Sequence, residues 1–370
     1  MRNRPLLLVL VVAGLASTSA DPPIIPTAAA DAAPIPARSA TRAASPSATT
    51  STVEPSVVPI SATAQQVTLA FAGDVRFGGE LARRLEDDPG TALAAVAPLL
   101  READVTVVNL ETAITERGTP APKQFTFRAA ATALDALRGA GVDVANMANN
   151  HGLDYGPESL TDALTASAER GFPLIGIGAT EDEAYQPFVT EVHGYRIAVL
   201  GATQVLDSVL VEPWTAIGEH GGLASAKRVD RLVAEVETSR AVADVVVVFL
   251  HWGVELDTCP TVSQQTLARR LVAAGADVIV GGHSHRLQGA GRLDEALVAY
   301  GLGNFAFSAL SAEGARSGVL EVTLTGRRVD DYRWRPARIS SGMPVPLEAE
   351  EAAEEVAAWE HLRACTGLAR

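Results

Sequence analysis

Short apolar runs alternate with longer amphipathic segments along this chain from Val67 onward, and this alternation constrains the fold more than any other feature. Runs of about four to eight apolar residues predict strands that are buried on both faces, whereas apolar residues that recur every three or four positions predict helices. Strands that alternate with helices are typical of α/β proteins with parallel strands. The sequence therefore predicts an α/β fold in a single domain.

The predicted elements follow one another in a regular order. The strands cover residues 67–72, 105–110, 142–148, 174–177, 196–201, 245–250, 278–280 and 297–302. The helices cover residues 79–100, 130–138, 157–170, 224–241 and 262–274. Nearer the C-terminus, antiparallel strands are predicted at 318–324 and 331–336, and an acidic, alanine-rich helix at 348–362.

The N-terminus has a different character. Arg2 and Arg4 precede the apolar run 6–16, and small residues follow at 17–20, which is the layout of a secretory signal peptide. The run is shorter than the roughly 20 apolar residues of a transmembrane helix, although an uncleaved signal anchor is the alternative. We therefore expect residues 1–20 to be a signal peptide, and the protein to be exported, either extracellular or associated with the cell envelope.

Three further segments complete the predicted organisation. Residues 21–65 are rich in Ala, Pro, Ser and Thr, with few large apolar side chains. Such a composition cannot offset the entropy of ordering, so it predicts a disordered linker. Residues 66–340 form the predicted folded domain, and residues 341–370 are predicted as an acidic C-terminal helical tail.

The net charge of the chain limits the kinds of partner that it can bind. The formal net charge of the 370 residues is −14 at pH 7. A field of this sign opposes nonspecific binding to nucleic acid or to an anionic membrane surface. We therefore expect no nucleic-acid partner, and an anionic substrate would need a local basic patch.

The chain has two cysteines, Cys259 and Cys365. An exported protein lies in an oxidising setting, where two thiols can pair. The sequence alone does not show whether their Cα atoms come within bridging distance, so both the pair and two free thiols stay open.

Potential metal ligands follow five of the predicted strands, at the point where each apolar run ends. They stand in Gly73-Asp74, Asn109-Leu110-Glu111, Asn149-Asn150-His151, His251-Trp252-Gly253 and Gly282-His283-Ser284-His285. Ligands collect at the carboxyl ends of strands in open α/β sheets, so we expect these side chains to meet. Carboxylates, an amide oxygen and imidazoles can hold two metal ions that share a bridging carboxylate.

Simpler explanations stay open for these residues. The stretch around Asn150 suits a polar turn, and Asp74 suits a helix cap. Glu111 could pair with a surface base, and His251 could be a core histidine with satisfied hydrogen bonds.

A series of motifs runs along residues 67–307. They are Ala72-Gly73-Asp74, Asn109-Leu110-Glu111, Phe125-Thr126-Phe127-Arg128, Ala148-Asn149-Asn150-His151, Asp154-Tyr155-Gly156, His251-Trp252-Gly253-Val254-Glu255, Gly281-Gly282-His283-Ser284-His285 and Gly303-Asn304-Phe305. In these motifs the chain resembles the capsule-synthesis CapA family of polyglutamate-capsule proteins, whose fold is related to calcineurin-like metallophosphoesterases. The resemblance implies a metallophosphoesterase-like αββα sandwich.

The resemblance also implies two metal sites that share one carboxylate. The first ion would be held by Asp74, Glu111 and His285. The second ion would be held by Glu111, Asn150, His251 and His283. His151 would then be the general acid that protonates a leaving group. The implied cofactors are one or two divalent cations, namely manganese, zinc, iron or magnesium.

One residue departs from the phosphoesterase pattern, which places Asp-x-His after the first strand. Here the third residue is Arg76, which cannot coordinate a cation and brings positive charge beside it. A single-metal site, or a second ion recruited with substrate, therefore stays open. Three basic residues are predicted to bind an anionic substrate, namely Lys123, Arg128 and Arg76. For Lys123, a solvated surface charge is the alternative.

The ligand set and the resemblance together predict a metal-dependent hydrolase or transferase that acts in synthesis, export or wall attachment of a poly-γ-glutamate-type capsule polymer. Its expected partners are this anionic cell-envelope polymer, or its precursor, and membrane proteins of capsule synthesis. Two other functions stay open. One is a general metallophosphoesterase, and the other is a non-catalytic protein of capsule assembly or polymer binding.

Overall fold

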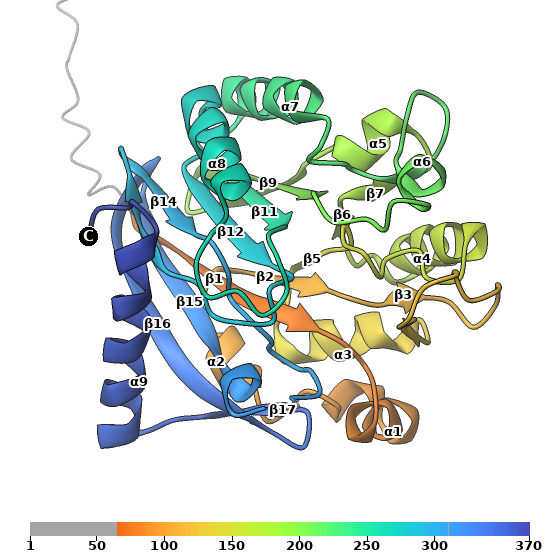
Figure 1. Cartoon of the computed structure of the whole chain (residues 1–370), viewed down its shortest axis with the longest axis horizontal. Coiled ribbons are helices and arrows are strands. Elements are labelled where there is room, and N and C mark those ends of the chain that lie inside the picture. Colours follow the sequence, from red (N-terminus) through yellow and green to blue (C-terminus); the bar gives the residue numbers. More distant parts are fainter. Residues whose placement is uncertain (1–64, 310) are drawn as a thin grey trace, which may run out of the picture. The chain divides into compact units, whose positions relative to one another are not determined.

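Two large β-sheets face each other in the computed structural model, which describes residues 65–309 and 311–370 (Figure 1). The predicted signal peptide at 1–20 lies outside the described residues, and so does the predicted linker at 21–65 except for its last residue. The described residues belong to one compact unit, in agreement with the single predicted domain.

The first sheet has seven strands and combines parallel and antiparallel pairs. In spatial order they are β17 (Met343–Pro346), β16 (Arg328–Ser340), β15 (Arg316–Thr325), β1 (Val67–Val75), β2 (Val105–Leu110), β5 (Val144–Asn146) and β6 (Leu174–Ile175). The strands β1, β2, β5 and β6 run parallel, whereas β15, β16 and β17 form an antiparallel extension beside β1.

The second sheet has six strands, with a parallel centre and an antiparallel strand at each edge. In spatial order they are β13 (Ala290–Leu293), β14 (Ala296–Ala299), β12 (Val278–Gly282), β11 (Val245–His251), β9 (Tyr195–Thr203) and β8 (Phe188–Val192). Two short pairs join β3 (Ala113–Ile114) to β4 (Arg128–Ala129), and β7 (Ile177–Gly178) to β10 (Gly222–Leu223).

The helices of the described residues lie between and after these strands. They are α1 (Glu80–Asp87), α2 (Ala97–Leu100), α3 (Thr132–Ala140), α4 (Pro157–Arg170), α5 (Glu181–Tyr185), α6 (Val211–Trp214), α7 (Val229–Val242), α8 (Val262–Ala274) and α9 (Ala349–His361). Short 3₁₀ turns lie at Pro89–Thr91, Glu313–Ala315 and Leu362–Cys365.

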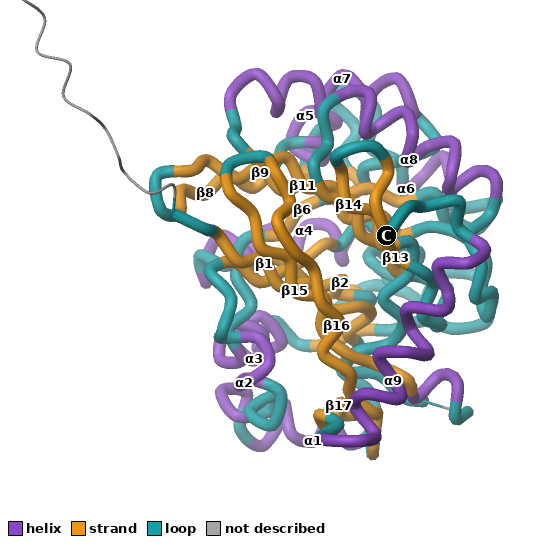
Figure 2. Tube along the Cα trace, turned by 90° about the vertical axis from the view of Figure 1, so that its left-hand side faces the viewer, coloured by secondary structure: helices purple, strands orange, loops and turns teal. Residues whose placement is uncertain are grey.

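Three apolar clusters show how the layers pack. Side chains on the inner faces of both sheets, such as Phe71 and Phe249, form the central cluster. The opposite face of the first sheet packs against α1, α3 and α4, and that of the second sheet packs against α7 and α8. Figures 1 and 2 show the helices on the outer sides of the sheets. This arrangement confirms the predicted αββα sandwich, because two sheets form the centre and helices cover each outer face.

Most predicted strands and helices are confirmed, and β2, α4 and α8 match to the residue. The single helix predicted at 79–100 is wrong. The chain leaves the helical conformation at Asp88, which is extended, and Pro89 then starts a short 3₁₀ turn. A proline disfavours helical geometry in the residue before it, so the apolar periodicity continues while the helix does not.

The helix predicted at 224–241 begins only at Val229. The residues before it are tied to the end of β9, because Thr203 donates a backbone hydrogen bond to Ala224 and accepts one from Ala226. The predicted start is therefore wrong by five positions, since backbone pairing with β9 overrides the helical spacing.

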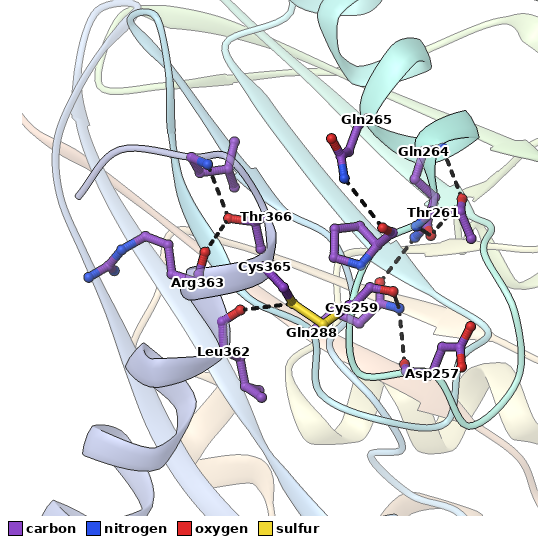
Figure 3. The surroundings of a disulfide bond; sticks show 12 residues. Asp257, Cys259, Thr261, Gln264, Gln265, Gln288, Leu362, Arg363, Cys365 and Thr366 are labelled. Atoms are coloured by element: carbon purple, nitrogen blue, oxygen red, sulfur yellow. Dashed lines mark hydrogen bonds between the residues drawn. A yellow bond between two sulfur atoms is a disulfide. The ribbon is translucent and has the colours of Figure 1, made fainter.

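Residues 341–370, predicted as a helical tail, form β17, α9 and the last turn of the chain. Trp359 of α9 is buried in the central cluster, and α9 lies along β16 (Figure 2). Cys365 forms a disulfide with Cys259, with Cα atoms 5.7 Å apart, which resolves the question that the sequence left open. Beside it, Gln288 donates a hydrogen bond to the carbonyl of Asp257 (Figure 3).

We searched the described helices for a membrane span. Within residues 65–309 and 311–370, no helix combines the length and the apolar character that crossing a bilayer requires.

Candidate metal centre

The predicted metal ligands lie at the carboxyl ends of strands in both sheets. Asp74 of β1 lies opposite Asn109 of β2, and His251 of β11 lies opposite Gly282 of β12. The ends of parallel strands meet at one edge of a sheet, and here the edges of both sheets contribute. Residues that are far apart in the sequence are therefore brought into one buried cluster.

The two sheets approach each other closely at this edge. A Cβ atom on Gly282 would lie 2.4 Å from Asp74 Oδ1, so only glycine fits beside that carboxylate. In the loop after β12, His283 and His285 have φ angles of 92° and 51°. Left-handed backbone in a residue with a side chain costs about 1–3 kcal/mol and is concentrated at functional sites.

The first ligand group consists of Asp74, Glu111 and His285, whose donor atoms all lie within 4.8 Å of one another. His285 Nδ1 is 3.2 Å from Asp74 Oδ2, and His285 Nε2 is 3.8 Å from Glu111 Oε1. Asp74 does not cap a helix, because α1 begins after Gly79 without a side-chain cap. The helix-cap explanation for Asp74 is therefore wrong.

The second ligand group consists of Glu111, His251 and His283, with donor atoms again within 4.8 Å of one another. His251 Nε2 lies 3.6 Å from Glu111 Oε1 and 2.7 Å from Asn150 Oδ1. The amide oxygen of Asn150 therefore joins this group, as the resemblance implied. Glu111 belongs to both groups, which is the arrangement of a bridging carboxylate.

Glu111 provides the test of whether the site fits a cation. Its side chain is fully buried, and neither carboxylate oxygen has a hydrogen-bond partner among the described residues. His283 Nδ1 is also buried without a partner there. Buried polar groups are normally satisfied, and an unpaired carboxylate is especially costly. The unpaired carboxylate of Glu111 belongs to both ligand groups, so the residues fit a bound divalent cation.

The protonation states of His251 and His283 agree with this fit, whereas His285 would have to lose a proton to bind a cation. Burial, reinforced by neighbouring His283, lowers the pKa of His251 well below its usual range. Burial also lowers the pKa of His283 to about 4. Burial lowers the pKa of His285 too, but the Glu111 and Asp74 carboxylates outweigh it and raise that pKa to about 10. His251 and His283 are thus neutral near pH 7, which is the form of imidazole that coordinates metals.

Burial, with the nearby Asp74 carboxylate, raises the pKa of Glu111 well above its ordinary value. Glu111 is fully buried, so the surface ion pair considered for it is wrong. A cation between the two ligand groups would favour the ionised form of Glu111.

Comparison with known families identifies the type of protein. The model of the family described as "Bacterial capsule synthesis protein PGA_cap" matches residues 68–309, which is more than half of the chain. The chain belongs to this family. Its members include CapA proteins of capsule and polyglutamate synthesis, as the sequence motifs predicted.

The chain is similar to known capsule proteins and to a solved structure. The chain is 29% identical to the capsule biosynthesis protein CapA of Bacillus anthracis over 76% of this chain and 70% of that protein. It is 27% identical to the PGA biosynthesis protein CapA of Bacillus subtilis over 77% of this chain and 74% of that protein. Among solved structures, a hypothetical protein of Thermus thermophilus is similar at 20% identity and a TM-score of 0.48, over 74% of this chain and all of that one.

In this capsule synthesis protein, two amides that were not predicted to act in the site hold its ligands. Asn109 Nδ2 lies 2.9 Å from Asp74 Oδ1 and 3.1 Å from His251 Nδ1, so one amide contacts both ligand groups. Asn304 Oδ1 lies 2.8 Å from His285 Nδ1. Such contacts orient metal ligands. Both asparagines belong to the motifs named in the sequence analysis, and this membership was the one sequence signal that could have indicated their role.

His151 belongs to neither ligand group. Its Nδ1 lies 2.6 Å from Asp154 Oδ2, and its ring stacks on Phe127 with the ring centroids 3.9 Å apart. Burial lowers the pKa of His151, and the Asp154 carboxylate opposes that shift. The histidine is thus held by a carboxylate through Nδ1, which leaves Nε2 as the atom for proton transfer. Asp154 was in a predicted motif, but its partnership with His151 was not predicted.

The three predicted substrate-binding residues are placed differently from one another. Lys123 is 7% exposed in its side chain and lies 3.0 Å from Asp154 Oδ1, so the surface-charge alternative is wrong. Its ammonium also donates to the carbonyl of Asn150, which fixes the ligand loop. The Arg128 guanidinium lies over the Tyr155 ring, 4.8 Å from its centroid, and the described residues show no ion pair between it and the ligand groups.

Arg76 lies beside the ligand groups without joining them. Its guanidinium is 3.8 Å from the centroid of the Phe127 ring, on which His151 also stacks. Burial lowers the pKa of Arg76, while the Glu111 and Asp154 carboxylates raise it. The Arg76 side chain therefore occupies no ligand position. Its positive charge interacts electrostatically with carboxylates of the site, such as Glu111.

Proposed function

We propose that this chain is an exported, metal-dependent hydrolase or transferase that acts on a capsule polymer of the poly-γ-glutamate type, during synthesis, export or wall attachment. The observation that carries the proposal is Glu111, a buried carboxylate shared by two ligand groups with both oxygens unpaired. Membership in the capsule synthesis family supplies the biological setting.

The ligand chemistry supports a particular class of cation. The two groups combine imidazoles with carboxylates, a mixture that suits manganese, zinc or iron better than magnesium, which prefers oxygen ligands and bound water. When bound, a divalent cation supplies Lewis-acid activation of water and of the substrate oxygen. Two ligand groups around one carboxylate leave room for one ion or two.

The remaining residues supply positioning and proton transfer. Asp154 holds His151 through Nδ1, so that Nε2 can donate a proton to the leaving atom of the bond that breaks. Lys123 holds Asp154 and the Asn150 loop in turn. Arg76 offers a guanidinium to an anionic group of the substrate, which is the fork geometry that carboxylates and phosphates prefer.

Two features support export and a place in the cell envelope. The first is the N-terminal pattern of basic, apolar and small residues, which is typical of a secretory signal. The second is the Cys259–Cys365 disulfide, since such bonds persist in oxidising compartments. The proposed partners are the anionic envelope polymer, or its precursor, and membrane proteins of capsule synthesis.

The test uses the purified chain with added manganese and a defined poly-γ-glutamate. Hydrolysis adds water across an amide bond and releases one amine and one carboxylate, so new amino groups report cleavage, and transfer to an added amine reports a transferase. We expect activity that His283→Ala abolishes and that the control His220→Ala keeps, because His220 lies on an exposed loop.

A parallel screen of phosphate esters separates the alternatives. Metal-dependent turnover of phosphate esters with no action on the polymer would make the protein a general phosphoesterase and contradict the proposal. Tight polymer binding without any turnover, at full metal occupancy, would instead favour a non-catalytic role in assembly.

A further inference from the structure

Arg76 begins a line of contacts that leads out of the metal centre. The ring of His151 stacks on Phe127, and the Arg76 guanidinium covers Phe127 with its Cζ 3.8 Å from the ring centroid. A Cβ atom added to Gly78 would lie 3.1 Å from Arg76 Cζ, so the guanidinium also lies against Gly78. Within the described part of the chain, no carboxylate forms an ion pair with Arg76, and its donors are available to a ligand.

Gly78 is also part of the wall of a cavity of about 530 Å³. Other parts of the wall are Ser308, in the loop after Phe307, and Ser341, in the turn between β16 and β17. The remaining wall comes from α1, which contributes Glu80, and from the end of β16, which contributes Ile339. The volume falls in the range of about 300–1,000 Å³ that small-molecule sites occupy.

Two arginines of α1, Arg83 and Arg84, line this cavity. Both pair with Glu80, and their side chains are 71% and 46% exposed. Exposed pairs of this kind contribute little to stability, so either guanidinium can exchange Glu80 for a ligand carboxylate at little cost. Two arginines against one glutamate leave a net positive charge in a chain whose overall charge is −14.

We propose that this cavity is a second anionic subsite, which binds a carboxylate of the polymer chain one or more units away from the bond held at the metal centre. Arg76 binds the unit next to the reacting bond, and Arg83 and Arg84 bind the unit beyond it. The subsite rests on the proposed function for the identity of the chain, a polymer of carboxylate-bearing units. The subsite explains how a strongly acidic protein can bind an acidic polymer. The positive charges of Arg76, Arg83 and Arg84 locally offset the repulsion between the polymer and the net negative charge of the protein.

The experiment measures binding of two probes by the full chain in the presence of manganese. One probe is a fluorescent γ-linked glutamate decamer, and the other is a single γ-linked dipeptide of glutamate. The variant Arg83→Ala/Arg84→Ala should bind the decamer up to about tenfold more weakly, because two exposed guanidiniums each lose a weak contact with a carboxylate. Binding of the dipeptide should be unchanged, because it reaches only the metal centre and Arg76.

A matched control removes the same charge elsewhere. Arg269→Ala/Arg270→Ala takes two arginines from α8, which lies on the outer face of the second sheet. This variant should bind the decamer like the unaltered chain. An equal loss in both double variants would show that only the overall charge matters, and that result would overturn the subsite.

Other outcomes separate the subsite from the proposed function. No decamer binding by the unaltered chain, or equal binding by the Arg83→Ala/Arg84→Ala variant, overturns the subsite even if the protein cleaves polymer. Equal losses for decamer and dipeptide overturn it as well, since a remote subsite cannot affect the shorter ligand. Conversely, selective loss of decamer binding in a protein that cleaves nothing supports the subsite and contradicts the proposed catalysis.

Discussion

Replacing Glu111 by glutamine should stabilise the folded protein when metal is absent and destabilise it when metal is bound. Glu111 is fully buried, both oxygens lack partners among the described residues, and the Asp74 carboxylate is close enough to raise its pKa further. In metal-free protein the residue must either carry an unpaired charge or take up a proton, and both reduce stability. In metal-loaded protein the same carboxylate is a shared ligand.

The magnitudes follow from these two situations. Glutamine would be as unpaired as the carboxylate, so Glu111→Gln removes only the cost of the charge or of the bound proton. It should stabilise metal-free protein by about 1 kcal/mol or more, since one pH unit in a pKa corresponds to about 1.4 kcal/mol. A cation present at 100 times its dissociation constant stabilises the folded state by about 2.7 kcal/mol. Loss of the bridging ligand removes most of that gain, so the variant should be less stable than the unaltered chain once metal is added.

The assay is urea denaturation of both proteins, in a chelator and in excess manganese. Glu321→Gln is the matched control, because Glu321 is also a buried carboxylate but is paired with Arg333 and Arg335. The control should lose about 2 kcal/mol under both conditions, since it removes charged hydrogen bonds that do not involve a cation. Glu111→Gln should be more stable than the unaltered chain in chelator and less stable in manganese. Glu321→Gln should be less stable than the unaltered chain under both conditions.

Two results would refute this reasoning. One is an unaltered chain whose unfolding free energy does not change with metal. The other is a Glu111→Gln variant that is destabilised equally in chelator and in manganese, which would make Glu111 a structural carboxylate with partners that the cluster geometry does not reveal.

Three further predictions use other residues of the site and the fold. His251→Ala should lower bound metal and turnover together, measured by elemental analysis and amine release, whereas His151→Ala should lower turnover at nearly normal metal content; an emptied site in the second variant would make His151 a ligand. Replacing Cys259 and Cys365 by serine should lower the unfolding free energy by up to about 5 kcal/mol, because the bond closes a loop with a sequence separation of 106, and an unchanged denaturation midpoint would contradict this. Arg76→His should raise the metal stoichiometry of the first ligand group and weaken polymer binding, and two ions in both proteins would show that the Arg76 charge does not limit occupancy.

The ligand positions could be predicted from the sequence because each follows a strand. Parallel strands bring their carboxyl ends to one edge of a sheet, so residues after neighbouring strands, such as Asp74 and Glu111, were expected to lie close together. The register of the sheets then fixed their separation, which no sequence pattern encodes. Family resemblance supplied the pairing of residues with individual ions.

Other contacts of the site depend on turns and on tertiary packing. The bond between His151 and Asp154 requires a particular turn after β5, and nothing in the spacing distinguishes it from a solvent-exposed pair. The stack of Arg76 on Phe127 joins segments about 50 residues apart and follows from packing. The disulfide likewise depends on where α9 ends against the loop after β11.

Helix ends were the least predictable part of the fold. The apolar spacing continues through Pro89, so a pattern-based prediction extends the helix where the missing amide proton and the extended Asp88 stop it. Short strands such as β3 and β10 have only two residues each, which is too few for a periodic signal.

The central claim is that the buried ligand groups around Glu111 hold divalent cations that the reaction needs. The most direct measurement is the metal content of the purified chain, beside Asp74→Ala and His283→Ala, with polymer cleavage followed in the same samples. The account predicts one or two transition-metal ions per chain, a loss of metal in each variant, and cleavage that falls in proportion. A chain that cleaves polymer fully without bound metal, or that keeps its metal in both variants, would contradict it.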